Sequence, residues 1–366
     1  MHKRVRPLLL TLLSILILLS ALPAAFAMEV PGELTRPGLP FLADYPAPAP
    51  IPGQNPVTGL PQADIPYTPV MQVLDNAPAA YPHWGVKEAD LFYQVPNAGA
   101  GGTKLLALFV GSFPERAGGS RSARPPFVNV AREWGAALVY AGHNNLPKGD
   151  MANVQDYLTQ AGMRQRVKAF NLLHNNNYSE RERGYGSPHN LSVHIRTIRD
   201  LAVENGAVFP TPRPFLFTDS LPESGVPARE FTVAHYGETR GSGKGNEPSF
   251  SRFVYQPELN AYWREHSRGW DADRDERETQ LAFANVIIQR VKFSHHNAYV
   301  LINDFEGTGA ADIFTGGRYI RGGWFKQDLD SRTVFVDENG QEIALQRGKT
   351  FIILTNDITT ATITGQ

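Results

Sequence analysis

The sequence predicts an α+β protein, with a mixed α/β N-terminal domain followed by a mainly β C-terminal domain. Its 366 residues exceed the roughly 250–300 at which a single hydrophobic core stops growing, so two domains are expected. A hydrophobic fraction of 42% with 10% aromatic residues can fill a core, which excludes wholesale disorder. Helical and strand patterns alternate up to about residue 205, whereas strand patterns dominate after residue 227.

The N-terminus has the three parts of a signal peptide. Lys3, Arg4 and Arg6 precede an apolar run over 8–22, and a small-x-small cleavage pattern ends at Ala27. We therefore expect a leader over 1–27 and an extracytoplasmic (secreted or cell-surface) protein after cleavage near Ala27. The apolar run is shorter than the roughly 20 residues of a spanning helix. An uncleaved leader remains an alternative and is the only membrane contact we expect.

The charge balance excludes some functions. Cleavage would remove three of the 35 basic residues and none of the 36 acidic ones, which gives the mature chain a formal charge of −4. Such a chain lacks the basic excess of a nucleic-acid binder. An exported protein would also meet little ATP or nicotinamide, so no cofactor is expected.

Five segments follow the leader. A proline-rich stretch, which includes Ala47-Pro48-Ala49-Pro50, is typical of an extended tether, although a coil packed along the body fits it equally well. Three prolines at 210, 212 and 214 indicate a linker, and the threonine-rich end of the chain indicates a tail. The predicted segments are a tether (28–54), a mixed α/β domain (55–205), a linker (206–226), a mainly β domain (227–356) and a tail (357–366).

In the first domain, apolar patterning and turn residues place each element. Phe127, Val130, Ala131 and Trp134 share one helix face, and glycines over 99–102 indicate a hairpin. Ser192 is a candidate N-cap for a helix that ends at Gly206. The predicted strands are 70–74, 91–95, 104–110 and 136–141; the predicted helices follow Pro125, Met151 and Ser192.

The second domain is predicted from β-rich runs separated by turns. Asp337-Glu338-Asn339-Gly340 is a hairpin turn, and the glycine-rich segment 241–245 is predicted to be a mobile loop. The predicted strands are 231–236, 250–255, 283–291, 298–302, 311–315, 333–336, 342–345 and 350–354.

The motif Ser120-Arg121-Ser122-Ala123-Arg124-Pro125-Pro126 is the best candidate for a binding site. It lies before a predicted helix start, where free backbone N–H groups and the helix dipole favour an anion. Arginine can also grip a carboxylate or phosphate with two hydrogen bonds. The alternative, of equal weight, is that both arginines pair with acidic residues of this protein and stabilise the helix start.

Polar residues follow two predicted strands. Asp75 and Asn76 come after the first, and His143 follows the strand that ends near Ala141. In a parallel sheet such residues border a ligand site, but turn-forming Asp and Asn occur there without any ligand. His143 is a candidate general base, although a lone loop histidine is more often structural.

Other chemistries lack a sequence signature. The chain has no cysteine, and neither His189/His194 nor His295/His296 has a zinc spacing, so no metal site is expected. There is no G-x-S-x-G elbow and no phosphate-loop register in 241–245. Three tryptophans could form a sugar-stacking face, but they are more often packing anchors; they are Trp263, Trp270 and Trp324.

Nine short segments form an ordered series along the chain: Pro56–Pro61, Val73–Asn76, Lys87–Tyr93, Leu106–Phe109, Arg121–Pro125, Pro188–Asn190, Tyr262–Arg264, Asn285–Ile287 and Gly322–Lys326. In that order they resemble the YerB-like family of predicted bacterial lipoproteins, a two-part family of unknown function. The resemblance spans about residues 55–355, and the ordered set carries it rather than any single segment.

This resemblance implies an exported, envelope-associated bacterial protein with no established chemistry. It also shows departures: Tyr81 stands where the family pattern has an arginine, Gln94 where it has a glutamate, and Lys104 where it has an arginine. These changes leave fewer groups for acid–base catalysis. The lipobox cysteine is absent too, so lipid anchoring through that residue is not expected.

The leading hypothesis is a non-catalytic module that binds a cell-wall component or an envelope protein; the alternative is a secreted hydrolase or transferase of wall glycan or peptide. Enzymatic activity is therefore uncertain, and its absence is favoured. In the alternative, His143 or His189 is the base and Asp75 orients it. The candidate ligand-binding residues are Asp75, Asn76, Arg121, Ser122, Arg124, His143, His189, Asn190, Arg264 and Trp324.

Overall fold

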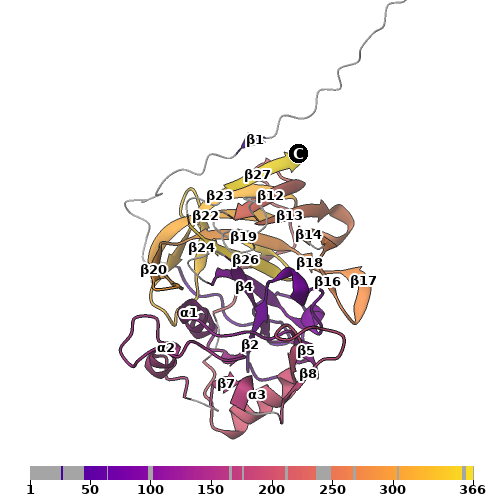
Figure 1. Ribbon diagram of the computed structural model, residues 1–366. Helices are drawn as coiled ribbons and strands as arrows, with labels where there is room; N and C mark the ends of the chain where they lie inside the picture. The colour runs from indigo at the N-terminus through magenta and orange to yellow at the C-terminus, as the bar shows by residue number, and fades with distance from the viewer. Residues whose placement is uncertain are drawn as a thin grey trace, which may run out of the picture.

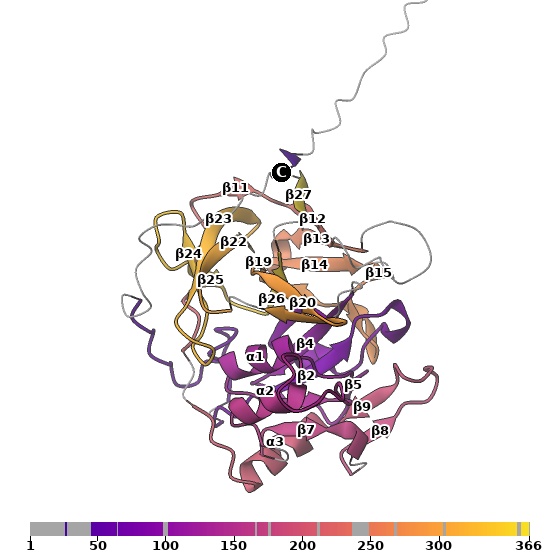
Figure 2. The same cartoon turned by 60° about the vertical axis from the view of Figure 1, so that its left-hand side comes forward.

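One mixed β-sheet takes strands from both halves of the chain (Figures 1 and 2). The computed structural model describes residues 26–27, 45–63, 65–97, 102–164, 167–174, 177–210, 213–235, 249–266, 269–302, 305–356 and 360–365. Strands predominate in this part of the chain, and its three α-helices all lie between Pro125 and Glu204. None of the helices described is long and apolar enough to cross a membrane.

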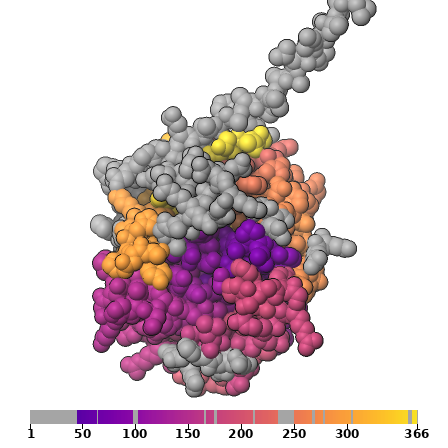
Figure 3. Space-filling view, viewed as in Figure 1, coloured from indigo at the N-terminus to yellow at the C-terminus, as the bar shows by residue number. Residues whose placement is uncertain are grey.

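The central sheet has 11 strands in the order β11-β23-β22-β19-β26-β3-β4-β2-β6-β7, with β24 beside β23. Its strands are β2 (Val70–Asp75), β3 (Leu91–Pro96), β4 (Thr103–Phe109), β6 (Ala137–Tyr140), β7 (Ala169–Asn171), β11 (Val226–Pro227), β19 (Asn285–Arg290), β22 (Gly307–Thr315), β23 (Arg318–Lys326), β24 (Val334–Asp337) and β26 (Thr350–Thr355). β26 joins the two halves, because it pairs in parallel with both β3 and β19. The indigo-to-magenta and orange-to-yellow halves accordingly form one continuous body (Figure 3).

A second sheet and one helix cover the first face of the central sheet. The second sheet runs β1-β27-β12-β13-β14-β15, with β18 beside β14. Aromatic side chains fill the interface: the Phe231 and Phe314 rings stack 3.6 Å apart, centroid to centroid. α3 (Ile195–Glu204) packs Ile198 against the N-terminal part of the same face. The strands of the second sheet are β1 (Phe26–Ala27), β12 (Glu230–His235), β13 (Ser249–Gln256), β14 (Ala261–His266), β15 (Gly269–Trp270), β18 (Ala282–Phe283) and β27 (Thr360–Gly365).

The opposite face of the central sheet lies under α1 (Pro125–Glu133) and α2 (Val154–Gln160). Phe127 and Trp134 from the α1 segment and Leu158 from α2 are buried there, as the helical spacing predicts. The short remaining strands are β5 (Ala117–Gly118), β8 (Ser179–Arg181), β9 (Leu191–Val193), β10 (Phe217–Thr218), β16 (Ala272–Asp273), β17 (Glu276–Gln280), β20 (Phe293–His296), β21 (Tyr299–Ile302) and β25 (Leu345–Gln346).

A buried ionic triad ties α1 to the C-terminal half of the chain. Glu133 accepts hydrogen bonds from Lys326 Nζ and Arg332 Nη1, each at 2.9 Å, and its side chain is fully buried. Burial opposes ionisation of Glu133, but the two cations outweigh it and lower the pKa of its carboxyl group. Because the charges are paired and hydrogen-bonded, they can stay in the interior.

Most of the predicted strands and all three α-helices are confirmed within a few residues. β3 and β4 are antiparallel neighbours, and of the hairpin predicted over 99–102 only residue 102 is described. The N-cap of α3 is a correction, because the helix begins after His194 and Ser192 lies within β9. β14 and β23 were not predicted. In β23 a Cβ at Gly322 would lie 2.1 Å from Val336 O, so glycine here permits close packing of strands.

Several predicted segments have a definite place in the structure. Residues 360–365 of the predicted tail form β27, and Phe215 of the predicted linker packs against Trp134. At the end of the predicted tether, Tyr45 is buried and its hydroxyl donates to Gly340 O. Of the predicted leader only Phe26 and Ala27 are described, and the predicted loop 241–245 lies outside the described residues. The domain boundaries themselves stay a prediction.

Candidate functional site

A fully buried carboxylate surrounded by basic side chains lies at the end of β2. We define the Asp75 cluster as Asp75, Lys104, Arg121 and His189. Lys104 Nζ lies 2.8 Å from Asp75 Oδ1, and Arg121 Nε lies 2.8 Å from Oδ2. His189 Nδ1 is 2.5 Å from Oδ2. Three sequence-predicted residues, Asp75, Arg121 and His189, are therefore in direct contact.

Backbone pairing explains why these residues meet. Asp75 and Lys104 are directly opposite in the antiparallel pair β2 and β4. The segment that follows β5 runs beside the end of β2, since Asp75 N donates to Gly119 O at 2.9 Å and Arg121 N donates to Val73 O at 2.9 Å. A Cβ at Gly119 would lie 2.1 Å from His189 O. Glycine at this position thus permits the close approach that delivers Arg121 and His189 to the same carboxylate.

The electrostatics of the cluster favour an ionised Asp75. Burial of its carboxyl opposes ionisation, but Lys104, Arg121 and His189 outweigh burial and lower the pKa of Asp75 to about 2. The carboxylate is inaccessible, whereas the side chains of Lys104, Arg121 and His189 are 15%, 28% and 20% exposed. The basic side chains therefore form the accessible part of the cluster.

A second group of polar residues adjoins the Asp75 cluster. We define the Arg264 cluster as Tyr81, Arg264, His266 and Asp271. Arg264 Nη1 lies 2.7 Å from Asp271 Oδ2, and His266 Nε2 lies 3.0 Å from Asp271 Oδ1. Burial opposes the charge on Asp271, yet Arg264 and His266 lower the pKa of its carboxyl group. The Tyr81 ring packs 3.8 Å from the His266 ring.

Two sets of contacts, one through a hydrogen bond of Tyr81 and one through the His83 ring, join the clusters. The Tyr81 hydroxyl donates to Asn76 Oδ1, and Asn76 directly follows Asp75. His83 Nε2 lies 2.6 Å from the carbonyl oxygen of Asp75, and its ring is 4.5 Å from that of Tyr81. The predicted residues Asn76 and Arg264 thus belong to one continuous network with Asp75, although Arg264 itself is only 2% exposed.

Family models match two segments of this chain. Residues 57–208 match "Protein of unknown function (DUF3048) N-terminal domain", and residues 243–352 match "Protein of unknown function (DUF3048) C-terminal domain". The chain belongs to this two-part family. Its DUF3048 relatives include "Putative lipoprotein YerB" of Bacillus subtilis (strain 168), which is 26% identical over 304 residues, 81% of this chain and 83% of that protein. The resemblance to the YerB-like family is thereby confirmed.

The fold of this DUF3048 protein matches a solved structure. The crystal structure of YerB protein from Bacillus subtilis superposes with a TM-score of 0.69 at 23% sequence identity, and covers 84% of this chain and 99% of that one. The family models meet in the central sheet, where β26 of the second pairs with β3 of the first.

Arg124 and Ser122 flank the Asp75 cluster without an acidic partner. Among the described residues, Arg124 makes no ion pair; its guanidinium lies 5.3 Å from the Tyr299 ring centroid, and Nη1 donates to Ala123 O. Burial and the charge of Arg121 lower the pKa of Arg124. Ser122 Oγ donates to Ala141 O at 3.0 Å. Arg121 thus pairs with an acidic residue of this protein, whereas Arg124 does not.

The helix start differs from the prediction in one respect. Free backbone N–H groups were expected there, but Pro125 and Pro126 have none, and the N–H groups of Phe127 and Val128 both bond to Arg124 O. An anion at this position would therefore be held by the arginine side chains and by the helix dipole.

Three predicted residues, His143, Asn190 and Trp324, have partners outside the Asp75 cluster. His143 lines a cavity of about 560 Å³; its Nδ1 lies 2.5 Å from Asn144 O and its Nε2 lies 2.8 Å from Gln155 Nε2. Both ring nitrogens of His143 therefore have polar partners within this protein. Asn190 follows His189 but bonds to Arg181 and Glu182 between β8 and β9.

Trp324 is fully buried, and its indole N–H donates to Arg290 O at 2.8 Å. It lies in β23 of the central sheet, whereas Trp263 and Trp270 lie in the second sheet with ring centroids 6.0 Å apart. The three tryptophans therefore form no common face.

Two functional candidates were missed as site residues. Lys104 and Tyr81 were noted only as departures from the family pattern, yet they contact Asp75 and Asn76, respectively. The predicted hairpin would have placed Lys104 opposite Val95 of β3, whereas Asp75 faces Lys104 through the pairing of β2 with β4, for which the sequence holds no signal. No sequence signal locates Asp271 either, which lies between β15 and β16.

Proposed function

We propose that this protein is an extracytoplasmic bacterial envelope protein that binds an anionic group of a cell-wall component at the Asp75 cluster and Arg124. The group would be a carboxylate or a phosphate, because arginine recognises both through paired hydrogen bonds. The location is supported by the leader pattern of residues 1–27 and by the lipoprotein name of the YerB relative. We also propose that the chain consists of a mixed α/β domain followed by a mainly β domain.

The observation that carries this proposal is the local excess of positive charge. Lys104 and Arg121 contact a single carboxylate, and the neighbouring Arg124 has no ion pair among the described residues. The ion pair of Arg121 with Asp75 is made through Nε, and in the described part of the chain its two terminal nitrogens make no ion pair. An anion placed between Arg121 and Arg124 would offset their mutual repulsion, and this supplies a reason to keep two cations so close.

Cosedimentation with purified cell walls tests the proposal. The full chain should pellet with the walls, and the Arg121→Ala/Arg124→Ala variant should bind at least tenfold more weakly, because each lost charge-assisted contact contributes about 1.5–3 kcal/mol. The matched control is Arg196→Ala/Arg318→Ala, which removes the same two charges from the surface away from the cluster. Walls stripped of phosphate polymers distinguish a phosphate ligand from a peptidoglycan carboxylate.

Two results would overturn the proposal. One is equal wall binding by wild type and a correctly folded Arg121→Ala/Arg124→Ala variant. The other is an equal loss in the control variant, which would mean that binding follows total charge. If wild type bound an envelope protein rather than walls, and the Arg121→Ala/Arg124→Ala variant did not, the site would be assigned to a protein partner.

A second function is favoured by one specific contact, the pair formed by His189 and Asp75. A buried carboxylate that holds Nδ1 of a partly exposed histidine orients the ring and leaves Nε2 to accept a proton. This arrangement suits a hydrolase or transferase of wall glycan or peptide. In zymography on purified walls, His189→Ala should abolish clearing and His143→Ala should retain it; no clearing by wild type would exclude this function.

A further inference from the structure

A cavity lies at the carboxyl ends of β6 and β7. These two strands are parallel neighbours, and ligands of open sheets bind beyond the carboxyl ends of such strands. Tyr140 and Asn171, the last residues of the two strands, line the cavity, and α2 forms another part of its wall. The cavity volume is about 560 Å³, which is within the range of small-molecule sites. None of its described lining residues belongs to the Asp75 cluster.

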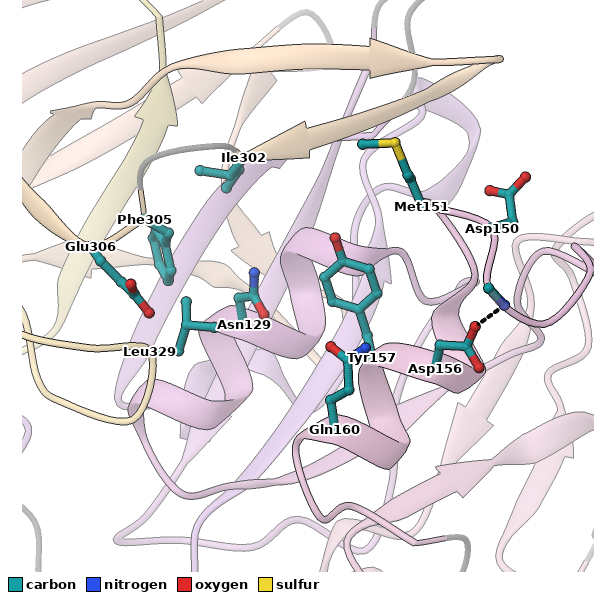
Figure 4. Close-up of a pocket in the computed structure, with 11 residues that line it drawn as sticks. Asn129, Asp150, Met151, Asp156, Tyr157, Gln160, Ile302, Phe305, Glu306 and Leu329 are labelled. Carbon is teal, nitrogen blue, oxygen red and sulfur yellow. Dashed lines mark hydrogen bonds between the residues drawn. The ribbon is translucent and has the colours of Figure 1, made fainter.

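The two sides of α2 line different cavities. Gln155 and Thr159 line the cavity at the strand ends, whereas Asp156 and Tyr157 line a neighbouring cavity beside α1 (Figure 4). The carboxylate of α2 therefore belongs to the other cavity. Among the described residues that line the cavity at the strand ends, none is acidic, and Arg164 is the one with a permanent charge.

A buried amide presents a donor without a partner to this cavity. Asn171 is 5% exposed, and its Oδ1 accepts hydrogen bonds from Gly142 N at 2.9 Å and Leu173 N at 3.2 Å. These two bonds determine which end of the amide is the oxygen. In the described part of the chain the other end, Nδ2, has no hydrogen-bond partner, although it remains accessible. Because a buried amide normally has partners at both ends, Nδ2 indicates a ligand that accepts a hydrogen bond.

The permanent charge in this wall also lacks a partner. Arg164 is exposed and forms no ion pair within the described ranges. Burial raises the pKa of the Tyr140 phenol to about 12, so this hydroxyl stays neutral at pH 7. The wall thus combines one positive charge with a free amide donor. A carboxylate matches both, because it carries one negative charge and accepts several hydrogen bonds.

The remaining wall suits the body of a small polar molecule. Leu158 and Met163 line the cavity and are each 3% exposed, so they supply apolar contact. Thr159 Oγ1 donates to Gln155 O at 2.7 Å, which leaves the hydroxyl oxygen able to accept a hydrogen bond. Gln155 Nε2 lies 2.8 Å from His143 Nε2, and this contact holds the histidine ring in the wall.

We propose that this cavity binds a small polar molecule through a single carboxylate group. Asn171 Nδ2 and the Arg164 guanidinium donate hydrogen bonds to the carboxylate. The rest of the molecule lies against Leu158 and Met163 and donates a hydrogen bond to Thr159 Oγ1. This site is separate from the proposed anion site at the Asp75 cluster and does not depend on it.

Isothermal titration of the full chain with N-acetylmuramic acid and with N-acetyl-D-alanine tests this inference. Each probe is a small polar molecule with one carboxylate, and wild type should bind at least one of them saturably at a single site. The neutral counterparts N-acetylglucosamine and N-acetyl-D-alaninamide should bind about tenfold more weakly, because neither carries the charge that pairs with Arg164. Comparison of the two acids distinguishes a sugar acid from an acylated amino acid as the ligand.

Asn171→Asp separates a binding role from a structural one. The aspartate keeps an oxygen that accepts from Gly142 N and Leu173 N, so thermal denaturation should stay close to that of wild type. It replaces the Nδ2 donor by a second carboxylate oxygen, which repels a bound carboxylate, so binding should fall about tenfold or more.

Arg164→Gln should weaken binding about fivefold or more, because it removes the cation that pairs with the ligand. The control Arg196→Gln removes the same charge from α3, on the opposite face of the central sheet, and should bind as wild type does. Because Arg164 is exposed, its replacement leaves the fold intact and keeps the test decisive if Asn171→Asp does not fold.

Four results would overturn the inference. They are the absence of saturable binding of either acid, equal binding of the acids and their neutral counterparts, unchanged binding by a folded Asn171→Asp variant, and an equal loss in the Arg196→Gln control. If Arg121→Ala/Arg124→Ala lost binding while Asn171→Asp kept it, the acid would be assigned to the Asp75 cluster instead.

Discussion

Replacing Asp75 by asparagine should measure how strongly the basic cluster depends on one carboxylate. Burial raises the pKa of the Asp75 carboxyl group, but Lys104, Arg121 and His189 outweigh burial and lower it to about 2, against roughly 3.9 for a free aspartate. A pKa lowered to this extent means that the ionised carboxylate contributes about 2–3 kcal/mol to stability at pH 7. Because Asp75 is fully buried, this value needs no reduction for solvent screening.

We expect Asp75→Asn to lower the free energy of unfolding by about 2–3 kcal/mol at pH 7, since it leaves Lys104 and Arg121 without a counter-charge. The folded-state pKa is depressed, so the contribution is fully present above the unfolded pKa and is lost as pH falls from about 4 to about 2. The difference between wild type and variant should therefore shrink over that range. Urea unfolding followed by tryptophan fluorescence measures both quantities.

A double variant supplies the control. In Asp75→Asn/Lys104→Met the carboxylate and its closest cation are removed together, so part of the lost stability should return. The reasoning is refuted if the free energy of unfolding of Asp75→Asn at pH 7 lies within about 0.5 kcal/mol of the wild-type value, because ordinary surface substitutions cause changes of that size. A difference that stays constant from pH 5 to pH 2 would refute the assigned pKa.

Three further predictions concern packing. Glu133→Gln should lower the free energy of unfolding by about 3–5 kcal/mol because it leaves two buried cations unpaired. Asp330→Asn, which removes an exposed ion pair, should lower it by less than about 1 kcal/mol. Thermal denaturation of both variants compares the two losses. Trp324→Phe should cost about 1–3 kcal/mol by leaving a buried carbonyl oxygen unsatisfied, with wall binding unchanged in the cosedimentation assay. Gly119→Ala should destabilise the fold and abolish wall binding, since its Cβ would lie 2.1 Å from His189 O. The control Gly186→Ala, whose Cβ would have no neighbour within 4 Å, should change neither stability nor wall binding.

How much could be predicted from the sequence depended on whether the signal was local. The helix face of α1 and the strand β2 follow from apolar spacing and are confirmed. The parallel pairing of β26 with β3 joins residues more than 250 positions apart, and periodicity carries no information on such partners. β23 escaped prediction because Gly322 and Gly323 resemble a turn unless the facing backbone of β24 is known.

The residues of the candidate site likewise divide into those with a local sequence signal and those brought together only by long-range contacts. Arg121 and Arg124 were identified from a local motif, and Asp75 from its position after a strand. Their assembly with His189, which is 114 residues from Asp75, depends on the chain crossing at Gly119.

The three departures from the family pattern fall within one connected region. Lys104 pairs with Asp75, while Tyr81 and Gln94 both face Arg264, at 3.4 Å from Nη1 and 3.5 Å from Nη2. An arginine, a glutamate and an arginine carry a net charge of +1, and so do tyrosine, glutamine and lysine. The changes at 81 and 94 remove one positive and one negative charge together, which is far less costly in a buried region than removing either alone. The basic residue at 104 stays beside Asp75, so the departures alter the Arg264 cluster while they preserve the positive charge on which the proposed anion site depends.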